Sequence, residues 1–524
     1  MAGGGRRELS WLELQHEVDA YAAFLATRGV RPGENVAYQL PNQLEFVVIT
    51  LAILRLGAVC APLMPIFREH ELEFMLRRAH ARVLIVPEQF KRTNHRELAL
   101  TVQRSCPELE HVIVLGDEPL APAGGDPGSV AGPASALGFT PDPDANAQLL
   151  FTSGTSGEPK GVLNSHRTLD LAAAAHIAHF GLNPSTTSAA GGEVIYSPSP
   201  IAHQTGFLYG MWLAITLGAP FVFHQSWEAE LGLRALTEAR VSFVQAATPF
   251  LADLVHLTRE RGQAPPALKY FVATGAAVPR ELAREAREIL DAEVGGGWGS
   301  TESCMGAAFL PGDLPERSWS TDGKVMDHVK IRIVDDNGQE LPPGSEGNYE
   351  LKSPTMFGGY LERPDLTAEA FTEDGYFRTG DLARLDQAGY LQITGRVKDV
   401  VNRGGEKIPV AEIEQLLYNH PEVLDVAIVA MPDARLGERA CAFVVPAKQG
   451  LPPAGQPYSE SPATELSFAA MQDYLDAHRV TKTYWPERLE IVDDLPRTPS
   501  GKVQKYVLRE RIARVAAAGN AVMR

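Results

Sequence analysis

Cysteine is scarce in this chain. Its 524 residues include four cysteines, Cys60, Cys106, Cys304 and Cys441, which are widely separated and form no CxxC pair. This spacing provides no disulfide framework, so a reducing, cytoplasmic setting is the expected location.

Positive charge is also in deficit. The chain has 48 lysines and arginines against 65 aspartates and glutamates, which gives a formal net charge of -17. A protein that binds the nucleic-acid backbone needs a basic surface, so nucleic acid is not an expected partner, although a local basic site is still compatible with this balance. The charged residues that follow Arg6 and Arg7 leave no apolar core for a signal peptide.

Long apolar runs are nearly absent. The stretch 46–67 is apolar except for Arg55 and is long enough to cross a bilayer. Gly57, Pro62 and Pro65 interrupt its second half, however, and short buried elements also give continuous apolar runs. We therefore predict a helix of about ten residues followed by a buried strand, and no membrane span.

Helical and strand-like segments alternate along most of the chain. Ser10 and Glu13 form a capping-box pattern ahead of a helix, and a helix over 69–79 precedes a strand over 83–86. Such alternation is typical of α/β sheets, and the length predicts at least two domains. Beyond Gly323, short strands and turns predict a small β barrel or sheet, and another α/β block begins near Val410.

The stretch 149–162 has the composition of a phosphate-binding loop. Glycines can expose backbone N–H groups, hydroxyls add donors and a lysine adds positive charge. The residues that supply these groups are Thr152, Ser153, Gly154, Thr155, Ser156, Gly157 and Lys160. Pro159 and Gly161 flank the lysine, which excludes the P-loop pattern. An ordinary Ser/Gly-rich turn is the alternative interpretation.

Four further segments have the composition of site loops. Residues 297–302 place a tryptophan near a carboxylate, which suits a planar base beside a metal ion. Residues 377–381 end on a carboxylate that could accept sugar hydroxyls, residues 395–407 mix cations with glycines, and residues 496–503 carry a lysine on a turn. Taken singly, each segment also fits a solvated turn.

In their order and spacing, these five segments resemble the motifs of the adenylate-forming superfamily, which comprises acyl-CoA synthetases, firefly luciferases and nonribosomal adenylation domains. The resemblance extends from about Leu9 to Arg509. It implies an α/β fold with a small β barrel: a large N-terminal domain of layered sheets, residues 1–397, and a small mobile C-terminal α+β domain, residues 398–524. Lys398 occupies the hinge position of the family.

The resemblance also implies roles for individual residues. In relatives, the segment matching Thr152 to Lys160 holds the β and γ phosphates of ATP. Glu302 matches the magnesium ligand of relatives. The residues that match contacts to adenosine and the α-phosphate are Gly275, Ala276, Ala277, Trp298, Gly299, Thr301, Asp381 and Arg396. Lys502 matches the lysine that bridges the acyl carboxylate and the α-phosphate during adenylation. Arg403, Gly404, Gly405 and Glu406 match the loop that approaches the pantetheine of CoA after rotation about Lys398.

The implied activity is an ATP- and Mg²⁺-dependent carboxylic acid:CoA ligase, with a small carboxylic acid, ATP and CoA as partners. An enzyme that loads an acyl carrier protein is the first alternative, and a non-catalytic nucleotide-binding relative is the second. A homodimer is left open.

The acyl pocket is expected around residues 199–210. Its implied residues are His203, Gln204 and Phe207, with Thr274 and Gly299. Amino-acid-activating relatives carry an aspartate near this point, whereas no acidic residue occurs here between Ser197 and Gln225. Apolar side chains, among them Trp212, favour a hydrophobic acid instead. The pattern looks most like short- and medium-chain or cyclohexanecarboxylate CoA ligases, with aryl-acid adenylating enzymes as the alternative.

Overall fold

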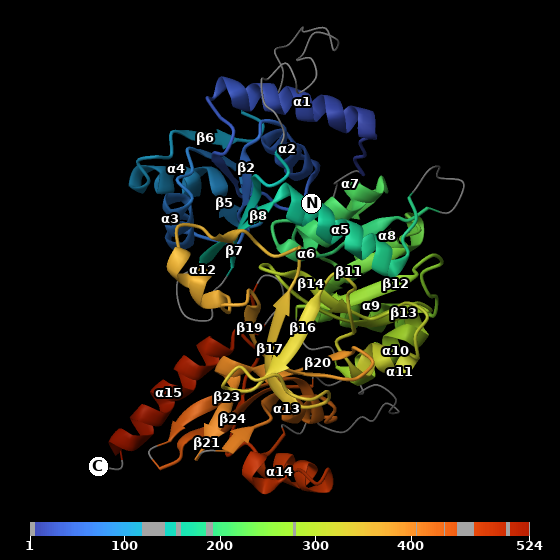
Figure 1. Ribbon diagram of the computed structural model, residues 1–524, viewed down its shortest axis with the longest axis vertical. Helices are drawn as coiled ribbons and strands as arrows, with labels where there is room; N and C mark the ends of the chain where they lie inside the picture. The colour runs from blue at the N-terminus through green and yellow to red at the C-terminus, as the bar shows by residue number, and fades with distance from the viewer. Residues whose placement is uncertain are drawn as a thin grey trace. The chain divides into compact units, whose positions relative to one another are not determined.

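The computed structural model describes residues 6–117, 142–152, 159–184, 192–275, 279–404, 406–433, 435–447, 466–498 and 503–522 (Figure 1). The chain divides into two compact units. Unit 1 comprises residues 1–245, 300–304 and 354–369, and unit 2 comprises residues 246–299, 305–353 and 370–524. Each unit is therefore assembled from segments that are far apart in the sequence.

Unit 1 is built on a seven-stranded sheet with the order β18-β8-β7-β2-β1-β3-β6. The strands are β1 Asn35–Tyr38, β2 Val59–Pro62, β3 Val83–Val86, β6 His111–Val114, β7 Asn146–Thr152, β8 Lys160–Ser165 and β18 Gly359–Tyr360. Strands β1, β2, β3, β6 and β7 pair in parallel, whereas β8 pairs antiparallel with both β7 and β18. The expected α/β sheet is thus confirmed, with an antiparallel edge.

Several helices of unit 1 lie where the sequence predicts them. They include α1 Trp11–Thr27, α2 Leu44–Arg55, α3 Glu69–Arg78, α4 His95–Ser105, α5 His166–Phe180 and α8 Ala229–Glu238. Ser10 caps α1 and forms the expected capping box with Glu13. Helix α2 and strand β2 account for the apolar run, whose side chains are mostly buried because they pack in the core.

A second group of strands in unit 1 is also parallel. Strand β9 (Ile195–Ser197) pairs with β10 (Phe221–Phe223) and with the start of β11 (Phe243–Ala247). Between β9 and β10 the chain forms a π-helix, η2 (Phe207–Trp212), flanked by α6 (Gln204–Gly206) and α7 (Leu213–Leu217). Rare in proteins, π-helices occur often at functional sites.

Unit 2 contains further strands and a separate antiparallel sheet. Strand β12 (Tyr270–Thr274) pairs in parallel with β13 (Glu293–Ser300), and the end of β14 (Cys304–Ala308) pairs with β15 (Lys324–Val325). The β-rich region expected beyond Gly323 is a four-stranded sheet, β16-β17-β19-β20. Its strands are β16 Lys330–Val334, β17 Glu346–Lys352, β19 Phe377–Leu385 and β20 Leu391–Arg396.

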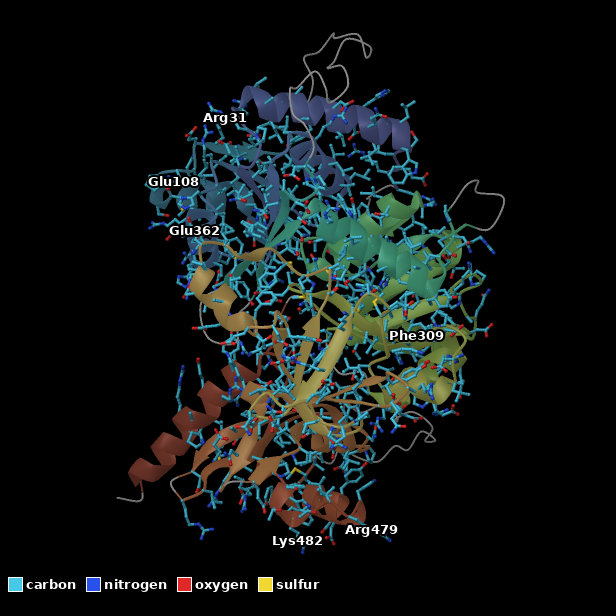
Figure 2. The ribbon with its side chains drawn as sticks, in the orientation of Figure 1. Arg31, Glu108, Phe309, Glu362, Arg479 and Lys482 are labelled. Atoms are coloured by element: carbon cyan, nitrogen blue, oxygen red, sulfur yellow. The ribbon has the colours of Figure 1, made fainter. Side chains whose placement is uncertain are left out.

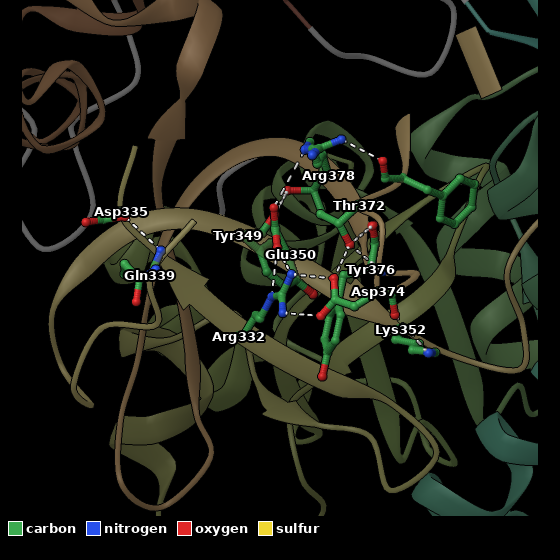
Figure 3. A network of polar contacts seen from close by, with 12 residues as sticks. Arg332, Asp335, Gln339, Tyr349, Glu350, Lys352, Thr372, Asp374, Tyr376 and Arg378 are labelled. Atoms are coloured by element: carbon green, nitrogen blue, oxygen red, sulfur yellow. Dashed lines mark hydrogen bonds and ion pairs between the residues drawn. The ribbon is translucent and has the colours of Figure 1, made fainter. Parts of the chain in front are cut away.

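An ion-pair network joins the first three strands of that sheet (Figure 3). The Arg332 guanidinium donates to Glu350 at 2.8 Å and to both Asp374 oxygens at 2.6 and 3.0 Å. Its plane also lies 4.0 Å from the centre of the Tyr376 ring. The side chain of Glu350 is buried, so Arg332 neutralises a charge that would otherwise be costly to bury.

The C-terminal part of unit 2 is a sheet covered by helices. Its strands have the order β22-β21-β24-β23, with β25 paired to β24. The elements are β21 Val401–Arg403, β22 Glu406–Ile408, α13 Val410–Tyr418, β23 Val423–Asp433, β24 Gly437–Pro446, α14 Phe468–Ala477, β25 Arg488–Ile491 and α15 Lys505–Val522. The two faces of this sheet carry separate apolar clusters. The hinge position, Lys398, precedes this sheet directly, and its role as the domain boundary stays a prediction.

Candidate functional site

The phosphate-type loop connects the hairpin strands β7 and β8. Thr152 ends β7, Lys160 begins β8, and the two residues are paired across the hairpin. The Thr152 hydroxyl lies 3.4 Å from the Lys160 carbonyl oxygen, to which it donates. Ser153, Gly154, Thr155, Ser156 and Gly157 lie outside the described residues, so their expected phosphate contacts stay predictions.

Gly161 is required by close packing. A Cβ atom at this position would lie 2.9 Å from the Leu149 Cδ1 atom and 3.2 Å from the Leu361 Cβ atom. The Gly161 carbonyl oxygen also accepts a hydrogen bond of 2.8 Å from the Leu361 N–H. The glycine therefore lets the segment after β18 approach β8 closely, a reason that differs from the backbone freedom expected from the sequence.

Lys160 and Glu302 meet through a residue that the sequence reasoning missed, Tyr360. The Lys160 ammonium lies 4.6 Å from the centre of the Tyr360 ring. The Tyr360 hydroxyl donates a 3.0 Å hydrogen bond to Glu302 Oε1. Burial, followed by the nearby Glu302 charge, raises the pKa of Tyr360, so the phenol stays protonated and able to donate.

A cavity of about 320 Å³ lies beside Lys160. Its wall combines apolar and cationic side chains: Phe74, Arg78, Pro159, Lys160, Gly161, Leu361, Arg363 and Leu366. Arg78 pairs with Glu362 at 3.7 Å, and Arg363 donates to Asp365. Glu362, which is labelled in Figure 2, also accepts from His80, and this bond fixes the segment to the rest of unit 1. Lys160 faces an aromatic ring, which leaves its charge available to an anion.

Trp298, Asp381 and Arg396 form a second cluster, in unit 2. The Trp298 indole N–H donates to Asp381 Oδ2 at 2.9 Å, and Arg396 Nε lies 2.9 Å from Asp381 Oδ1. The Trp298 ring packs edge-on against Tyr349 at 4.5 Å. Asp381 is 4% exposed. A carboxylate has about four lone-pair positions. Counting the described residues, Trp298 and Arg396 occupy two of them, so others can accept a ligand's hydroxyl groups.

Three residues expected on loops lie in strands. Asp381 lies within β19, where it pairs with Arg396 of β20, and Trp298 and Gly299 lie within β13. A strand holds a side chain in a more fixed direction than a solvated turn does. The geometry is therefore more rigid than the glycine content of these segments suggested.

Asp322 is a neighbouring carboxyl group with a perturbed pKa. Its Oδ2 accepts a 2.7 Å hydrogen bond from the Ile393 N–H. Desolvation, the largest cause, and the nearby Asp381 charge raise the pKa of Asp322 from 3.8 to about 6, while Arg280 opposes the shift. The carboxyl group is only partly charged in weakly acidic solution.

Replacing Asp322 by asparagine should stabilise the protein at pH 7.5. The folded state binds the Asp322 proton more tightly than the unfolded state, so the free energy of unfolding falls as pH rises from about 4 to 6 and stays lower above that range. An asparagine carries no such penalty and can still accept from Ile393. We expect a gain of about 1 kcal/mol at pH 7.5 that shrinks toward pH 4, measured by urea unfolding.

Asp335 offers a matched control of opposite sign. Its Oδ1 accepts from the backbone N–H groups of Gln339 and Asn337 at 2.8 and 2.9 Å (Figure 3), and these bonds lower the pKa of Asp335. The stabilisation is present above the unfolded pKa and is lost as pH falls below it. Asp335→Asn should therefore destabilise at pH 7.5, and a stabilising effect of both variants would contradict the assignment.

The hinge position is attached to the last helix. Lys398 lies in a short 3-10 helix, Val397–Asp399, and its carbonyl oxygen accepts from Arg509 of α15 at 3.3 Å. Arg509 also forms an ion pair with Asp399.

The loop expected to approach pantetheine is held by an ion pair. Arg403 and Glu406 face each other across β21 and β22, and Gly404 between them adopts a φ of 61°. The Arg403 guanidinium donates to both oxygens of Glu487, at 3.1 and 2.9 Å, which raises the pKa of Arg403. Arg403 thus has a protein partner. Gly405 lies outside the described residues.

The expected acyl-pocket residues of unit 1 surround the π-helix. His203 precedes α6, and its Nδ1 accepts from the Thr205 N–H at 3.3 Å, while Gln204 is buried next to the Cys304 thiol. Burial raises the pKa of Cys304 to about 12, so this thiol is unreactive at neutral pH. Phe207 is fully buried and stacks on Trp212 at 6.2 Å, which makes it part of the core.

The remaining expected site residues lie at the ends of strands or outside the described residues. Thr274 ends β12 and Gly275 follows with a φ of 85°, both in unit 2, and Thr301 follows β13 directly in unit 1. Ala276, Ala277 and Lys502 lie outside the described residues. Within the described ranges, no cluster of three or more His, Cys, Asp or Glu residues is arranged to hold a metal ion, and no helix is long and apolar enough to cross a membrane.

Comparisons with known proteins agree along nearly the whole chain. The model of the AMP-binding enzyme family matches residues 1–361, and that of the AMP-binding enzyme C-terminal domain matches residues 412–502. The chain is 36% identical over 509 residues to a medium-chain fatty-acid–CoA ligase of Escherichia coli, covering 96% of this chain and 85% of the relative.

Two further matches bear on chemistry and fold. A salicyl-AMP ligase / salicyl-S-ArCP synthetase of Mycobacterium tuberculosis is 32% identical over 518 residues, covering 96% of this chain and 85% of that protein. The solved structure of ATP-bound MatB from Rhodopseudomonas palustris matches with a TM-score of 0.81 and 26% identity, over 97% of this chain and 94% of that one.

Proposed function

Since this chain belongs to the AMP-binding enzyme family of adenylate-forming ligases, we propose that it is an ATP-dependent carboxylic acid:CoA ligase that acts on a hydrophobic acid. The observation that carries this proposal is the contact of Lys160 and Glu302 with one tyrosine, which brings a phosphate-type cation and a metal-type carboxylate to the same place. The buried Asp381 supplies the acceptor that a ribose needs.

In the first half-reaction, the substrate carboxylate attacks the α-phosphorus of ATP. A new P–O bond forms, the bond to pyrophosphate breaks, and an acyl-AMP results. The nucleophile is already ionised at neutral pH, so no general base is needed. Catalysis then depends on positioning and on cations that offset the developing charge, which Lys160, Arg396 and Lys502 supply.

The residues around Glu302 fit a magnesium ion. Mg²⁺ is usually bound by one or two carboxylates together with substrate phosphates. Glu302 is such a lone carboxylate, its Oε1 is fixed by Tyr360, and the described residues contain no larger ligand cluster. When bound, the ion would neutralise phosphate charge. Glu302 would hold it, and Lys160 would bind the phosphate oxygens from the hairpin.

In the second half-reaction, the thiol of CoA attacks the acyl carbonyl carbon, a C–S bond forms and AMP leaves. Rotation about Lys398 would move Lys502 away and bring residues 403–406 to the site. The two half-reactions need different catalytic residues, and a domain movement can exchange these residues at one site.

The proposed acid is of short or medium chain length, alicyclic or aromatic. The relative from Escherichia coli acts on medium-chain fatty acids, and the region 199–225 has no acidic side chain to pair with a substrate ammonium. A second candidate is transfer to a carrier-protein pantetheine, which the name of the Mycobacterium tuberculosis relative favours.

A screen by ATP–pyrophosphate exchange tests the proposal. We expect exchange with at least one acid among C4 to C12, alicyclic and aromatic acids, and at least about 10²-fold less with amino acids, because the stretch 199–225 contains no acidic residue to pair with their ammonium group. Product analysis with free CoA and with a holo carrier protein then identifies the acceptor. Exchange with none of the acids would favour a non-catalytic relative.

A further inference from the structure

We propose that Tyr360 is a positioning residue that holds Glu302 in place for Mg²⁺ and keeps Lys160 directed at the phosphates. The inference rests on the proposed function, since it assigns a task to a residue beside the groups that would bind Mg²⁺ and ATP. It concerns one hydrogen bond and one ring contact, both within unit 1.

Backbone hydrogen bonds attach the segment around Tyr360 both to Glu302 and to the strand that carries Lys160. On one side, the Phe357 N–H donates to the Glu302 carbonyl oxygen at 2.8 Å. On the other, Tyr360 pairs with Val162 of β8, two residues after Lys160. The Tyr360 N–H also donates to the Thr367 hydroxyl at 2.9 Å. The side chain therefore has a fixed place between the carboxylate and the ammonium.

Gly359 makes this conformation possible. Its φ of 135° is disfavoured for residues with a side chain, and a Cβ atom would meet the Thr367 side chain at 3.3 Å. The backbone thus adopts a conformation that favours glycine directly before Tyr360. A residue with a side chain at this position would disturb the strand that presents Tyr360 to Lys160.

The arrangement solves a chemical problem. A lysine and a glutamate that lie near each other tend to form an ion pair, which would occupy both charges before the substrate binds. The aromatic ring attracts the ammonium without neutralising it. The hydroxyl holds Glu302 Oε1, and Oε2 makes no hydrogen bond with the part of the chain that the structure describes, so it can bind a ligand. Tyr360 thus contacts both charged groups, and no ion pair joins Lys160 to Glu302 among the described residues.

The test measures ATP binding by calorimetry without acid or CoA, once with Mg²⁺ and once with EDTA. In Tyr360→Phe the ring stays and the hydroxyl is lost, so the factor by which Mg²⁺ tightens ATP binding should fall about 10-fold, with binding in EDTA unchanged. Tyr360→Leu also removes the ring and should weaken binding in EDTA by about 3-fold or more. In pyrophosphate exchange, the KM for MgATP should rise more than kcat falls.

Tyr38→Phe is the matched control. It removes a buried hydroxyl of the same kind, bonded to the Thr50 hydroxyl at 2.6 Å within unit 1, away from Lys160 and Glu302 in the fold. Its magnesium factor should stay within about 2-fold of the parent, since it loses a similar hydrogen bond elsewhere.

Three outcomes would overturn the inference. The first is that Mg²⁺ tightens ATP binding by the same factor in Tyr360→Phe as in the parent. The second is an equal loss of ATP affinity with Mg²⁺ and with EDTA. The third is loss of the folded state, judged by circular dichroism, in Tyr360→Phe but not in Tyr38→Phe. Failure of the parent protein to bind ATP would instead count against the proposed function. The two failures are therefore distinguishable.

Discussion

Replacing Lys502 by alanine should lower ATP–pyrophosphate exchange by about 10²- to 10³-fold, because adenylation would lose the cation proposed to stabilise charge developing between the acyl carboxylate and the α-phosphate. The same variant should convert supplied acyl-AMP and CoA to the thioester at a rate within about 3-fold of the parent, since in the proposed mechanism Lys502 would have moved away before that step. Both rates are measured on one preparation.

Lys482→Ala is the control for this experiment. Lys482 is an exposed lysine of the same C-terminal region (Figure 2), with its ammonium 5.4 Å from the Trp485 ring. The Lys482→Ala variant should carry out both half-reactions at the rates of the parent. If Lys502→Ala lost both half-reactions to the same extent, the lysine would have no role specific to adenylation, and the proposed exchange of residues would be wrong.

Asp381→Asn should raise the Kd for ATP by about 10- to 100-fold, because a charged acceptor for hydroxyl groups is replaced by a weaker neutral one. The substitution also leaves Arg396 without its carboxylate partner and alters the acceptor of the Trp298 indole. Since Arg396 is partly exposed, we expect a modest loss of stability, about 1–2 kcal/mol. Calorimetric ATP binding and urea unfolding measure the two effects separately.

Asp374→Asn is the control for Asp381→Asn, because it removes an ion pair with an arginine but leaves the proposed ribose-binding carboxylate in place. Asp374, in the turn before β19, binds through both oxygens the guanidinium of Arg332 on the same antiparallel sheet (Figure 3), but its side chain is 56% exposed. ATP binding should be unchanged in this variant. A similar loss of affinity in both variants would mean that the integrity of the sheet matters, rather than the carboxylate of Asp381.

Local signals were sufficient to predict much of the fold. The capping box at Ser10 and Glu13 fixed the start of the first helix, and the prolines and glycine of the run 46–67 divided a helix from a strand. These signals act within a few residues, so an isolated sequence contains them. The resemblance to adenylate-forming enzymes was confirmed by both family models.

Contacts between distant segments could not be predicted. Nothing near Tyr360 indicates that it meets Glu302 and Lys160, because the three are brought together by pairing of β18 with β8 and by the bond from Phe357 to Glu302. The glycines at 358 and 359 allow an unusual backbone conformation there, but they do not identify the partners of Tyr360. Likewise, the burial of Phe207 and Trp212 depends on the π-helix, whose pattern cannot be told from an α-helix over six residues.

The assembly of unit 1 from separated segments has a consequence for biosynthesis. Strands β7 and β8 leave the ribosome long before β18, which completes their sheet and brings Tyr360 to Lys160. At 5–20 residues per second, the edge of β8 would wait about 10–40 s for its partner. An uncovered strand edge invites pairing with other chains, so nascent chains that stall between residues 165 and 359 should be the form most prone to aggregate and most in need of a chaperone.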